Sequence, residues 1–259
     1  MAKITFLGTA SSIPAKTRDN TSFLFTHKKH NLLVDCPGSI SHKLLKIGVD
    51  FTKVKNIIIT HEHIDHIYGL VSLIHTQGYL NLNPINIFSN PSSIKLIKKL
   101  VPLFRLNRKN YPKIRYINVF SKKHFFRKKD LSLEAIKNSH IKNSFGIKFS
   151  FAKGKSKGKL FYSSDTSFSP SMLEKAGDVD FLIHDCTASY AYFRKHPALY
   201  EMHTTSKTLN AYLSAKTKLK LIPIHFLLLE KDEEKRIKKE LAGIRKRVIW
   251  PQDFKAINL

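Results

Sequence analysis

Residues 57–66, Ile-Ile-Ile-Thr-His-Glu-His-Ile-Asp-His, constrain what this chain can fold into more than any other stretch. The β-branched run from Val54 to Thr60 predicts a short buried strand. Apolar residues then recur with helical spacing from Ile67 to Ile74, which predicts a helix. The histidines and carboxylates of this stretch therefore lie where a strand ends and a helix begins. A backbone turn at that point can direct several of these side chains toward one centre.

The donor types in this stretch indicate a metal site. Imidazole nitrogens and carboxylate oxygens are the ligands that borderline divalent metals such as zinc take. The common helical zinc signature is excluded, because His61-Glu62 would need a second histidine at the position of Asp65. The pattern is instead His-x-His-x-Asp-His over residues 61–66. A polar loop with chance histidines is the alternative, but four ligands at fixed offsets rarely coincide.

Strands and helices are predicted to alternate along the chain, with no linker to divide it. The predicted strands are 3–7, 22–26, 31–35, 54–60, 85–88, 131–137, 145–152, 160–163, 181–183 and 221–224. The predicted helices are 40–47, 67–74, 92–100, 171–175, 206–215 and 230–247. Residues of ligand type recur directly after strands, so loops at one edge of a sheet are expected to share a site. We therefore expect one α/β domain over residues 1–259.

The motif His61-x-His63-x-Asp65-His66 resembles that of the metallo-β-lactamase superfamily of metal-dependent hydrolases. This resemblance implies the four-layer αββα sandwich of that superfamily. It also implies a binuclear centre with two divalent ions, zinc in the first place, with Mn²⁺ or Fe²⁺ as alternatives.

Four further residues match the order of the superfamily's later motifs, each directly after a predicted strand. They are Asp35, His140, Asp165 and His225. The resemblance implies that His61, His63 and His140 hold one metal ion. Asp65, His66 and His225 then hold the second, and Asp165 bridges the two. Asp65 is also expected to accept the proton of the attacking, metal-bridging water, and Asp35 to orient the motif through hydrogen bonds.

Secondary motifs are similar to those of the ribonuclease Z family. Gly8-Thr9 with Pro14-x-Lys16-x-Arg18 resembles that family's Pro-x-Lys-x-Arg loop. Residues 184–187, His-Asp-Cys-Thr, stand where the family has His-Glu-Ala-Thr, and residues 203–205, His-Thr-Thr, where it has His-Ser-Thr. The resemblance implies that His203, held by Asp185, protonates the departing oxygen. The alternative for His203 is a capping role at the helix that starts near Ser206.

The chain also departs from the ribonuclease Z pattern. Asp35-Cys36-Pro37-Gly38 replaces Asp-Cys-Gly-Glu, and Asp185 replaces a glutamate. Only 24 residues separate His140 from Asp165, where the family inserts a long arm that grips tRNA. The short basic turn from Lys153 to Lys159 is all that this chain offers there.

Net charge indicates a polyanionic partner. The chain has 45 Lys and Arg against 19 Asp and Glu, a formal charge of +26. No carboxylate occurs from residue 67 to residue 129, where aromatic residues alternate with basic ones. The candidate RNA contacts are Arg105, Arg108, Lys109, Lys122, Lys123, Lys153 and Lys155. A biased composition, or a solvated basic face with its aromatics packed inward, is the alternative.

Two functions therefore compete. The first is a ribonuclease Z-like phosphodiesterase acting on structured, tRNA-like RNA, including tRNA 3′ processing. The second is a phosphodiesterase for small molecules such as cyclic nucleotides or cyclic phosphates. The basic span favours the first, and the missing arm favours the second. A thioester or lactone hydrolase and a non-catalytic RNA-binding relative are less well supported.

The sequence lacks two features that would direct the protein to a membrane or out of the cell. No stretch reaches the ~18 apolar residues of a membrane span, and the apolar run at the N-terminus is too short for a signal peptide. Two cysteines, Cys36 and Cys186, exclude a disulfide framework. We expect a cytoplasmic protein with no membrane partner, and a homodimer remains open.

Overall fold

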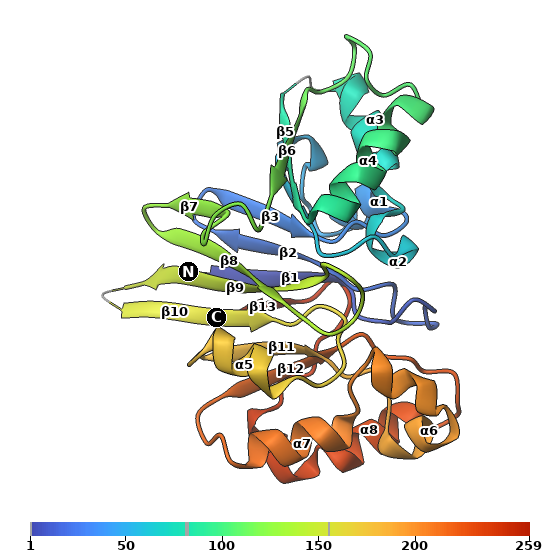
Figure 1. Ribbon diagram of the computed structural model, residues 1–259, viewed down its shortest axis with the longest axis vertical. Coiled ribbons are helices and arrows are strands. Elements are labelled where there is room, and N and C mark those ends of the chain that lie inside the picture. The colour runs from blue at the N-terminus through green and yellow to red at the C-terminus, as the bar shows by residue number, and fades with distance from the viewer. Residues whose placement is uncertain (1, 81–82, 155) are drawn as a thin grey trace.

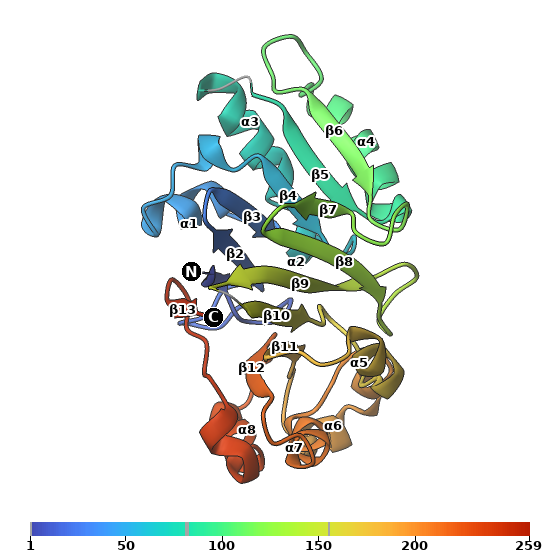
Figure 2. The ribbon, with the colours of Figure 1, turned by 90° about the vertical axis from the view of Figure 1, so that its left-hand side faces the viewer.

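Two β-sheets packed face to face form the centre of the computed structural model, which describes residues 2–80, 83–154 and 156–259 (Figures 1 and 2). Within the described residues the first sheet has the strand order β13-β1-β2-β3-β4-β5-β6, and the second has β12-β11-β10-β9-β8-β7. The strands of the first sheet are β1 Ala2–Gly8, β2 Ser22–His27, β3 His30–Val34, β4 Asn56–Ile59, β5 Ile85–Ser89, β6 Ile114–Asn118 and β13 Ala256–Asn258. Those of the second are β7 Phe126–Lys128, β8 Leu131–Lys137, β9 Phe145–Lys153, β10 Ser156–Tyr162, β11 Phe181–Asp185 and β12 Lys220–Ile224.

Helices cover the outer face of each sheet (Figure 1). The α-helices are α1 Ile40–Lys46, α2 Ile64–Ile67, α3 Leu70–Leu80, α4 Pro91–Leu103, α5 Pro170–Ala176, α6 Tyr190–Lys195, α7 Ser206–Ser214 and α8 Glu233–Glu240. The 3₁₀ segments are η1 Phe51–Lys53, η2 Pro197–Glu201 and η3 Ala242–Arg247. Helices α1, α3 and α4 pack on the first sheet, and α5, α7 and α8 pack on the second. No helix in the described part of the chain has both the length and the apolar composition needed to cross a bilayer.

Three buried clusters hold these four layers together. One lies between the sheets, and one lies under the helices on each outer face. The strand period of two explains this division, since Leu160 and Tyr162 of β10 face the inter-sheet core while Phe161 between them faces the helices. The predicted four-layer αββα sandwich is confirmed.

Parallel pairing determines where the functional loops meet. Strands β3 to β6 run parallel in the first sheet, and β10 to β12 run parallel in the second. Their carboxyl ends therefore lie at one edge of each sheet, as in other layered α/β folds. Asp35 follows β3, His61 follows β4 closely, and His225 follows β12.

The sequence predictions failed at exposed edges and at one helix. The single helix predicted for residues 230–247 is wrong, because α8 ends at Glu240 and η3 continues to Arg247. Gly243 in this stretch disfavours a continuous α-helix. The strands β6, β7 and β13 and the helix α6 were not predicted. The three strands are sheet edges, where exposed polar residues remove the alternation that predicts a strand.

Candidate metal centre

Three histidines from two loops converge as a first donor group. His61 and His63 come from the turn between β4 and α2, and His140 follows β8. His61 Nε2 lies 3.2 Å from His63 Nδ1, and His140 Nε2 lies 3.0 Å from the same His63 nitrogen. Imidazole nitrogens this close to one another are suited to share one cation.

A second donor group lies beside the first and contains two carboxylates. It consists of Asp65, His66, Asp165 and His225, whose donor atoms lie within 4.8 Å of one another. Asp165 Oδ2 is 2.9 Å from His225 Nε2 and 3.2 Å from His66 Nε2. Asp65 Oδ2 lies 3.3 Å from His66 Nε2. The structure thus brings together the seven residues that the sequence indicated as ligands.

Asp165 lies between the two groups. Besides its contacts in the second group, its Oδ2 is 3.9 Å from His61 Nε2 and 3.9 Å from His140 Nε2 of the first. Its other oxygen, Oδ1, is buried and has no hydrogen-bond partner among the described residues. A tetrahedral zinc site with bonds of about 2.0–2.2 Å places neighbouring donors roughly 3.3 Å apart. The donor spacings in both groups therefore fit divalent metal ions, with one carboxylate available to both.

On three of the donor histidines, the ring nitrogen that faces away from the centre has a nearby polar partner. His140 Nδ1 lies 3.0 Å from the carbonyl of Met202, and His225 Nδ1 lies 3.1 Å from Thr187 Oγ1. His66 Nδ1 is 3.0 Å from Asp35 Oδ2. Such outer partners fix the ring orientation and the tautomer of a metal-ligating histidine. The partners of His140 and His225 come from other loops, and sequence reasoning missed them.

Asp35 is fully buried and organises the start of the metal motif. Its Oδ1 accepts hydrogen bonds from the backbone N–H of Thr60 at 2.8 Å and from Thr60 Oγ1 at 3.0 Å. The hydroxyl of Tyr162 donates to Oδ2 at 3.3 Å. Ser164 in turn donates to Thr60 Oγ1 at 2.9 Å, which links the loop before Asp165 to the loop before His61. The one available sequence signal for Thr60 was its place directly before His61.

Left-handed backbone conformations mark three residues at the carboxyl ends of strands. Asp35 has φ 57°, Ser164 has φ 55° and His225 has φ 68°. Residues other than glycine adopt such angles rarely and at a cost of roughly 1–3 kcal/mol, and they cluster at functional sites. Here the conformation turns the chain sharply at the end of a strand, at or just before a donor residue.

Electrostatics show that the centre attracts positive charge. Burial alone would lower the pKa of His225, but the carboxylates of Asp165, Asp185 and Asp65 raise it to about 9. Burial likewise opposes ionisation of Asp165, yet His225 and His66 hold its pKa well below its usual range. His140 behaves differently, since burial lowers its pKa to about 4 despite the attraction of Asp165. Burial therefore disfavours the protonated form of His140, whereas nearby carboxylates favour that of His225.

His203 and Asp185 form a hydrogen-bonded pair beside the second donor group. His203 Nδ1 lies 2.8 Å from Asp185 Oδ2, and its ring stacks on that of His225 with the centroids 5.0 Å apart. Asp185 is fully buried and accepts further hydrogen bonds from the backbone of Thr166 and from Thr187. The capping alternative for His203 is wrong, because the N-cap of α7 is Thr205, whose side chain accepts from the N–H of Thr208. His203 is thus oriented toward the donor cluster by a buried carboxylate.

The candidate RNA contacts are scattered. The first turn of α4 lies beside the metal motif, because Ser93 Oγ donates a hydrogen bond to Glu62. Arg105, Arg108 and Lys109 follow the opposite end of this helix. Twelve helical steps place Leu103 about 18 Å from that turn. In both views the loop after α4 lies at the top of the molecule, away from α2 (Figures 1 and 2).

The basic turn of the β9–β10 hairpin is also remote from the metal donors. Lys153 lies eight residues beyond the start of β9, about 27 Å along the strand. Nothing is described of its side chain, and Lys155 lies outside the described residues. Lys122 and Lys123 differ, because they are exposed and follow the carboxyl end of β6 at the edge that carries the metal motif.

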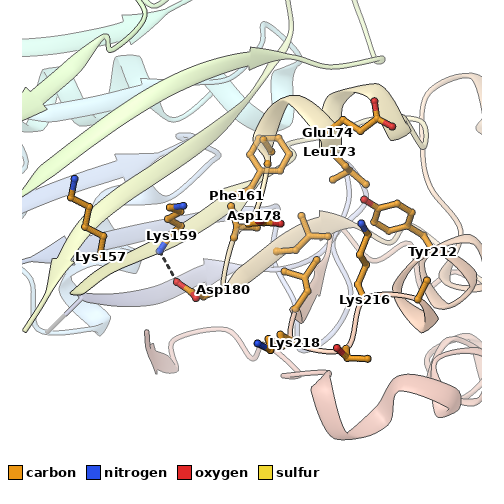
Figure 3. A pocket seen from close by; sticks show the side chains of 17 residues that line it. Lys157, Lys159, Phe161, Leu173, Glu174, Asp178, Asp180, Tyr212, Lys216 and Lys218 are labelled. Carbon is orange, nitrogen blue, oxygen red and sulfur yellow. Dashed lines mark hydrogen bonds between the residues drawn. The ribbon is translucent and has the colours of Figure 1, made fainter. Parts of the chain in front are cut away.

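The hollow drawn in Figure 3 lies elsewhere, on the outer face of the second sheet. It has a volume of about 720 Å³ and an apolar floor that includes Phe161, Leu173 and Leu182. Lysines and carboxylates surround it, and Lys159 donates its backbone N–H to Asp180 at 2.8 Å. None of the described residues that line it is a histidine, so it is separate from the metal donors.

Comparison with known proteins gives a family and relatives for this chain. The family model described as Anti-Pycsar protein Apyc1 matches residues 2–244. Ribonuclease Z of Picrophilus torridus is 35% identical over 150 residues, which cover 56% of this chain and 47% of that protein. The chain therefore spans about half the length of this relative.

Solved structures show the same fold. The metallo-β-lactamase fold protein YhfI from Bacillus subtilis superposes with a TM-score of 0.79 at 18% identity, covering 99% of this chain and 98% of that one. The short form of human tRNase Z gives a TM-score of 0.77 at 22% identity, covering 99% and 98%. The resemblance to the metallo-β-lactamase superfamily, and within it to ribonuclease Z, is confirmed. The chain thus has the metallo-β-lactamase fold.

Proposed function

The chain belongs to the family described as Anti-Pycsar protein Apyc1, and from its donor cluster we propose that it is a two-metal phosphodiesterase for a small phosphodiester such as a cyclic nucleotide. One observation supports the proposal of two metal ions. Asp165 Oδ2 lies within 3.9 Å of histidine nitrogens from both donor groups, so two adjacent cations can share one carboxylate. Paired divalent ions lower the pKa of a water molecule and stabilise charge on both the attacking and the departing oxygen of a phosphodiester.

The chain's own residues supply the remaining chemistry. His61, His63 and His140 would hold one ion, and Asp65, His66 and His225 the other. Asp65 presents a carboxylate oxygen beside His66, where it can accept the proton of the attacking water. His203 can donate a proton to the departing oxygen, because Asp185 occupies its Nδ1 and leaves Nε2 free to face the substrate.

The choice of a small substrate rests on the surroundings of the donors. Residues 145–162 between His140 and Asp165 form the hairpin β9–β10, which extends away from α2 and α6 (Figure 1). Three of the seven candidate RNA contacts, Arg105, Arg108 and Lys109, follow the far end of α4. The family model also matches residues 2–244, nearly the whole chain.

RNA is the second candidate, supported by a different observation. The net charge of +26 and the acid-free residues 67–129 suit a polyanion, and Lys122 and Lys123 lie at the edge of the donors. The ribonuclease Z relatives favour the same candidate. On this alternative the phosphodiester chemistry is unchanged, and only the substrate is larger.

A side-by-side assay separates the two candidates. Zinc-loaded protein is incubated with a cyclic nucleotide, with bis(p-nitrophenyl) phosphate and with precursor tRNA. We expect hydrolysis of the first two and no discrete cleavage of the third. Cleavage of the tRNA at its 3′ end with the cyclic nucleotide left intact would establish the RNA candidate instead. Failure to hydrolyse any of the three would contradict the proposed function.

A further inference from the structure

Two large apolar side chains are exposed on the helix that carries the metal donors. Ile64 is 71% exposed and Tyr68, the C-cap of α2, is 64% exposed. Asp65 and His66 on the same turn are buried and face the centre. An exposed tyrosine or isoleucine is ordinary on its own, but this pair directly flanks two metal donors.

The spacing of the pair places both side chains on one face. Residues four apart on a helix are neighbours on its surface, and the N–H of Tyr68 donates to the carbonyl of Ile64 at 2.9 Å. Four helical steps separate the two residues by about 6 Å along the helix axis, and Asp65 lies between them along that axis. The pair therefore forms one apolar surface beside the second donor group.

The loop of residues 36–38 supports the Tyr68 ring from one side. A Cβ atom at Gly38 would lie only 3.2–3.3 Å from two carbons of the Tyr68 ring, so the ring packs directly on the Gly38 backbone. The N–H of Gly69 donates to the carbonyl of Cys36 at 2.8 Å, and a side chain at Gly69 would collide with the carbonyl of Pro37. The ring is fixed from one side while most of it remains in solvent. Such a fixed aromatic surface loses little conformational freedom when a planar group binds.

We propose that Ile64 and Tyr68 form a platform on which the base of a nucleotide substrate stacks while its phosphodiester lies at the metal donors. This inference rests on the proposed function and deepens it, because it selects phosphodiesters that carry a nucleobase. Every base presents a planar face, so the platform favours nucleotides over base-free sugar phosphates without selecting one base. Stacking on an aromatic side chain contributes enough to raise affinity by about 5- to 100-fold.

A pair of ligands that differ only by the base tests the platform. Calorimetry on zinc-loaded protein compares adenosine 5′-monophosphate with ribose 5-phosphate. We expect wild-type protein to bind the nucleotide about 5- to 100-fold more tightly. Tyr68→Ala should remove most of that ratio and leave the affinity for ribose 5-phosphate unchanged, while Tyr68→Phe should preserve it. Ile64→Ala should lower the ratio by a smaller factor.

Tyr79 provides the matched control. It is 75% exposed and lies in the last turn of α3, at the end of that helix remote from the donors. Tyr79→Ala should leave the ratio at its wild-type value.

The platform and the proposed function fail in different ways. The platform alone would be overturned if wild type and Tyr68→Ala had the same ratio of nucleotide to ribose 5-phosphate affinity while the wild type hydrolysed bis(p-nitrophenyl) phosphate. Absence of that hydrolysis in the wild type would overturn the proposed function.

Discussion

The charged side chains differ in their surroundings between the edge of the molecule that holds the metal donors (the metal edge) and the loop after α4. At the metal edge, histidines and carboxylates are buried and lie in direct contact, as in the pair Asp165 and His225 at 2.9 Å. In the loop after α4, residues 105–113, the basic side chains Arg105, Arg108 and Lys109 are exposed and form no ion pair with any described residue. Charge interactions are strong where water is excluded and are screened at the surface. Substitutions at the metal edge should therefore have large effects, and substitutions in the loop small ones.

The largest effect is expected at Asp165. Asp165→Ala removes the carboxylate that lies between both donor groups, so the metal content should fall from two ions per chain to one or none. Hydrolysis should fall by more than the ~10²–10⁴-fold that a single acid–base group contributes. Elemental analysis and steady-state kinetics measure both. Asp178→Ala, an exposed carboxylate away from the donors, is the control and should keep both ions. Full metal occupancy in Asp165→Ala would remove the distinction between the two regions.

The next effect concerns the buried pair of His203 and Asp185. His203→Ala should slow hydrolysis of phosphodiesters with poor leaving groups by roughly 10²–10⁴-fold, because protonation of the departing oxygen is lost. p-Nitrophenolate leaves without a proton, so hydrolysis of its esters should slow much less. Thr205→Ala, which removes the N-cap of α7, should cost about 1 kcal/mol of stability without any dependence on the leaving group. Equal slowing of both substrate types would assign His203 a structural role.

A smaller effect is expected from pH on metal-free protein. The pKa of His225 is raised to about 9 by the adjacent carboxylates, above its usual value of about 6.5. Its protonated form stabilises the fold fully below about pH 6.5, and this contribution is lost as pH rises through about 9. The melting temperature of metal-free protein should therefore fall between pH 7 and pH 9.5, while that of zinc-loaded protein should change less. Zinc affinity should rise over the same range, as the metal displaces the proton.

The smallest effect is expected in the loop after α4. Combined substitution of Arg105, Arg108 and Lys109 by Ala should leave hydrolysis of a cyclic nucleotide within about twofold, because exposed charges ~18 Å away are screened. The same variant should reduce the salt dependence of RNA binding by a log–log slope of roughly 0.7 per lost phosphate contact on a single strand, if the loop binds RNA. Lys122→Ala with Lys123→Ala is the comparison at the metal edge. A strong loss of cyclic-nucleotide hydrolysis in the loop variant would show that the two regions act together.

Sequence reasoning reached the donors because their signals are local. His61, His63, Asp65 and His66 lie in one motif, and Asp35, Asp165 and His225 follow strands whose apolar runs are legible. Among the groups that orient the donors it reached Asp35, but not the carbonyl of Met202 or the hydroxyl of Thr187, since these depend on tertiary contacts. The carbonyl of Met202, 62 residues from His140, carries no sequence signal at all.

The position of the basic residues was equally hidden from the sequence. In the sequence, residues 105–129 looked like one basic surface. The strand β6 lies within this segment, so the residues before it and the residues after it lie at opposite ends of the strand. That strand was not evident from the sequence, because the periodicity of an edge strand is weak. Charge composition therefore indicated a polyanionic partner without locating the residues that would bind it.

Anomalous scattering from crystals of the zinc-loaded protein would locate the metal ions. We expect two zinc peaks about 3.5–4 Å apart, one on each side of Asp165, with His61, His63 and His140 around one and Asp65, His66 and His225 around the other. A single peak, or two peaks that do not share Asp165, would contradict this expectation.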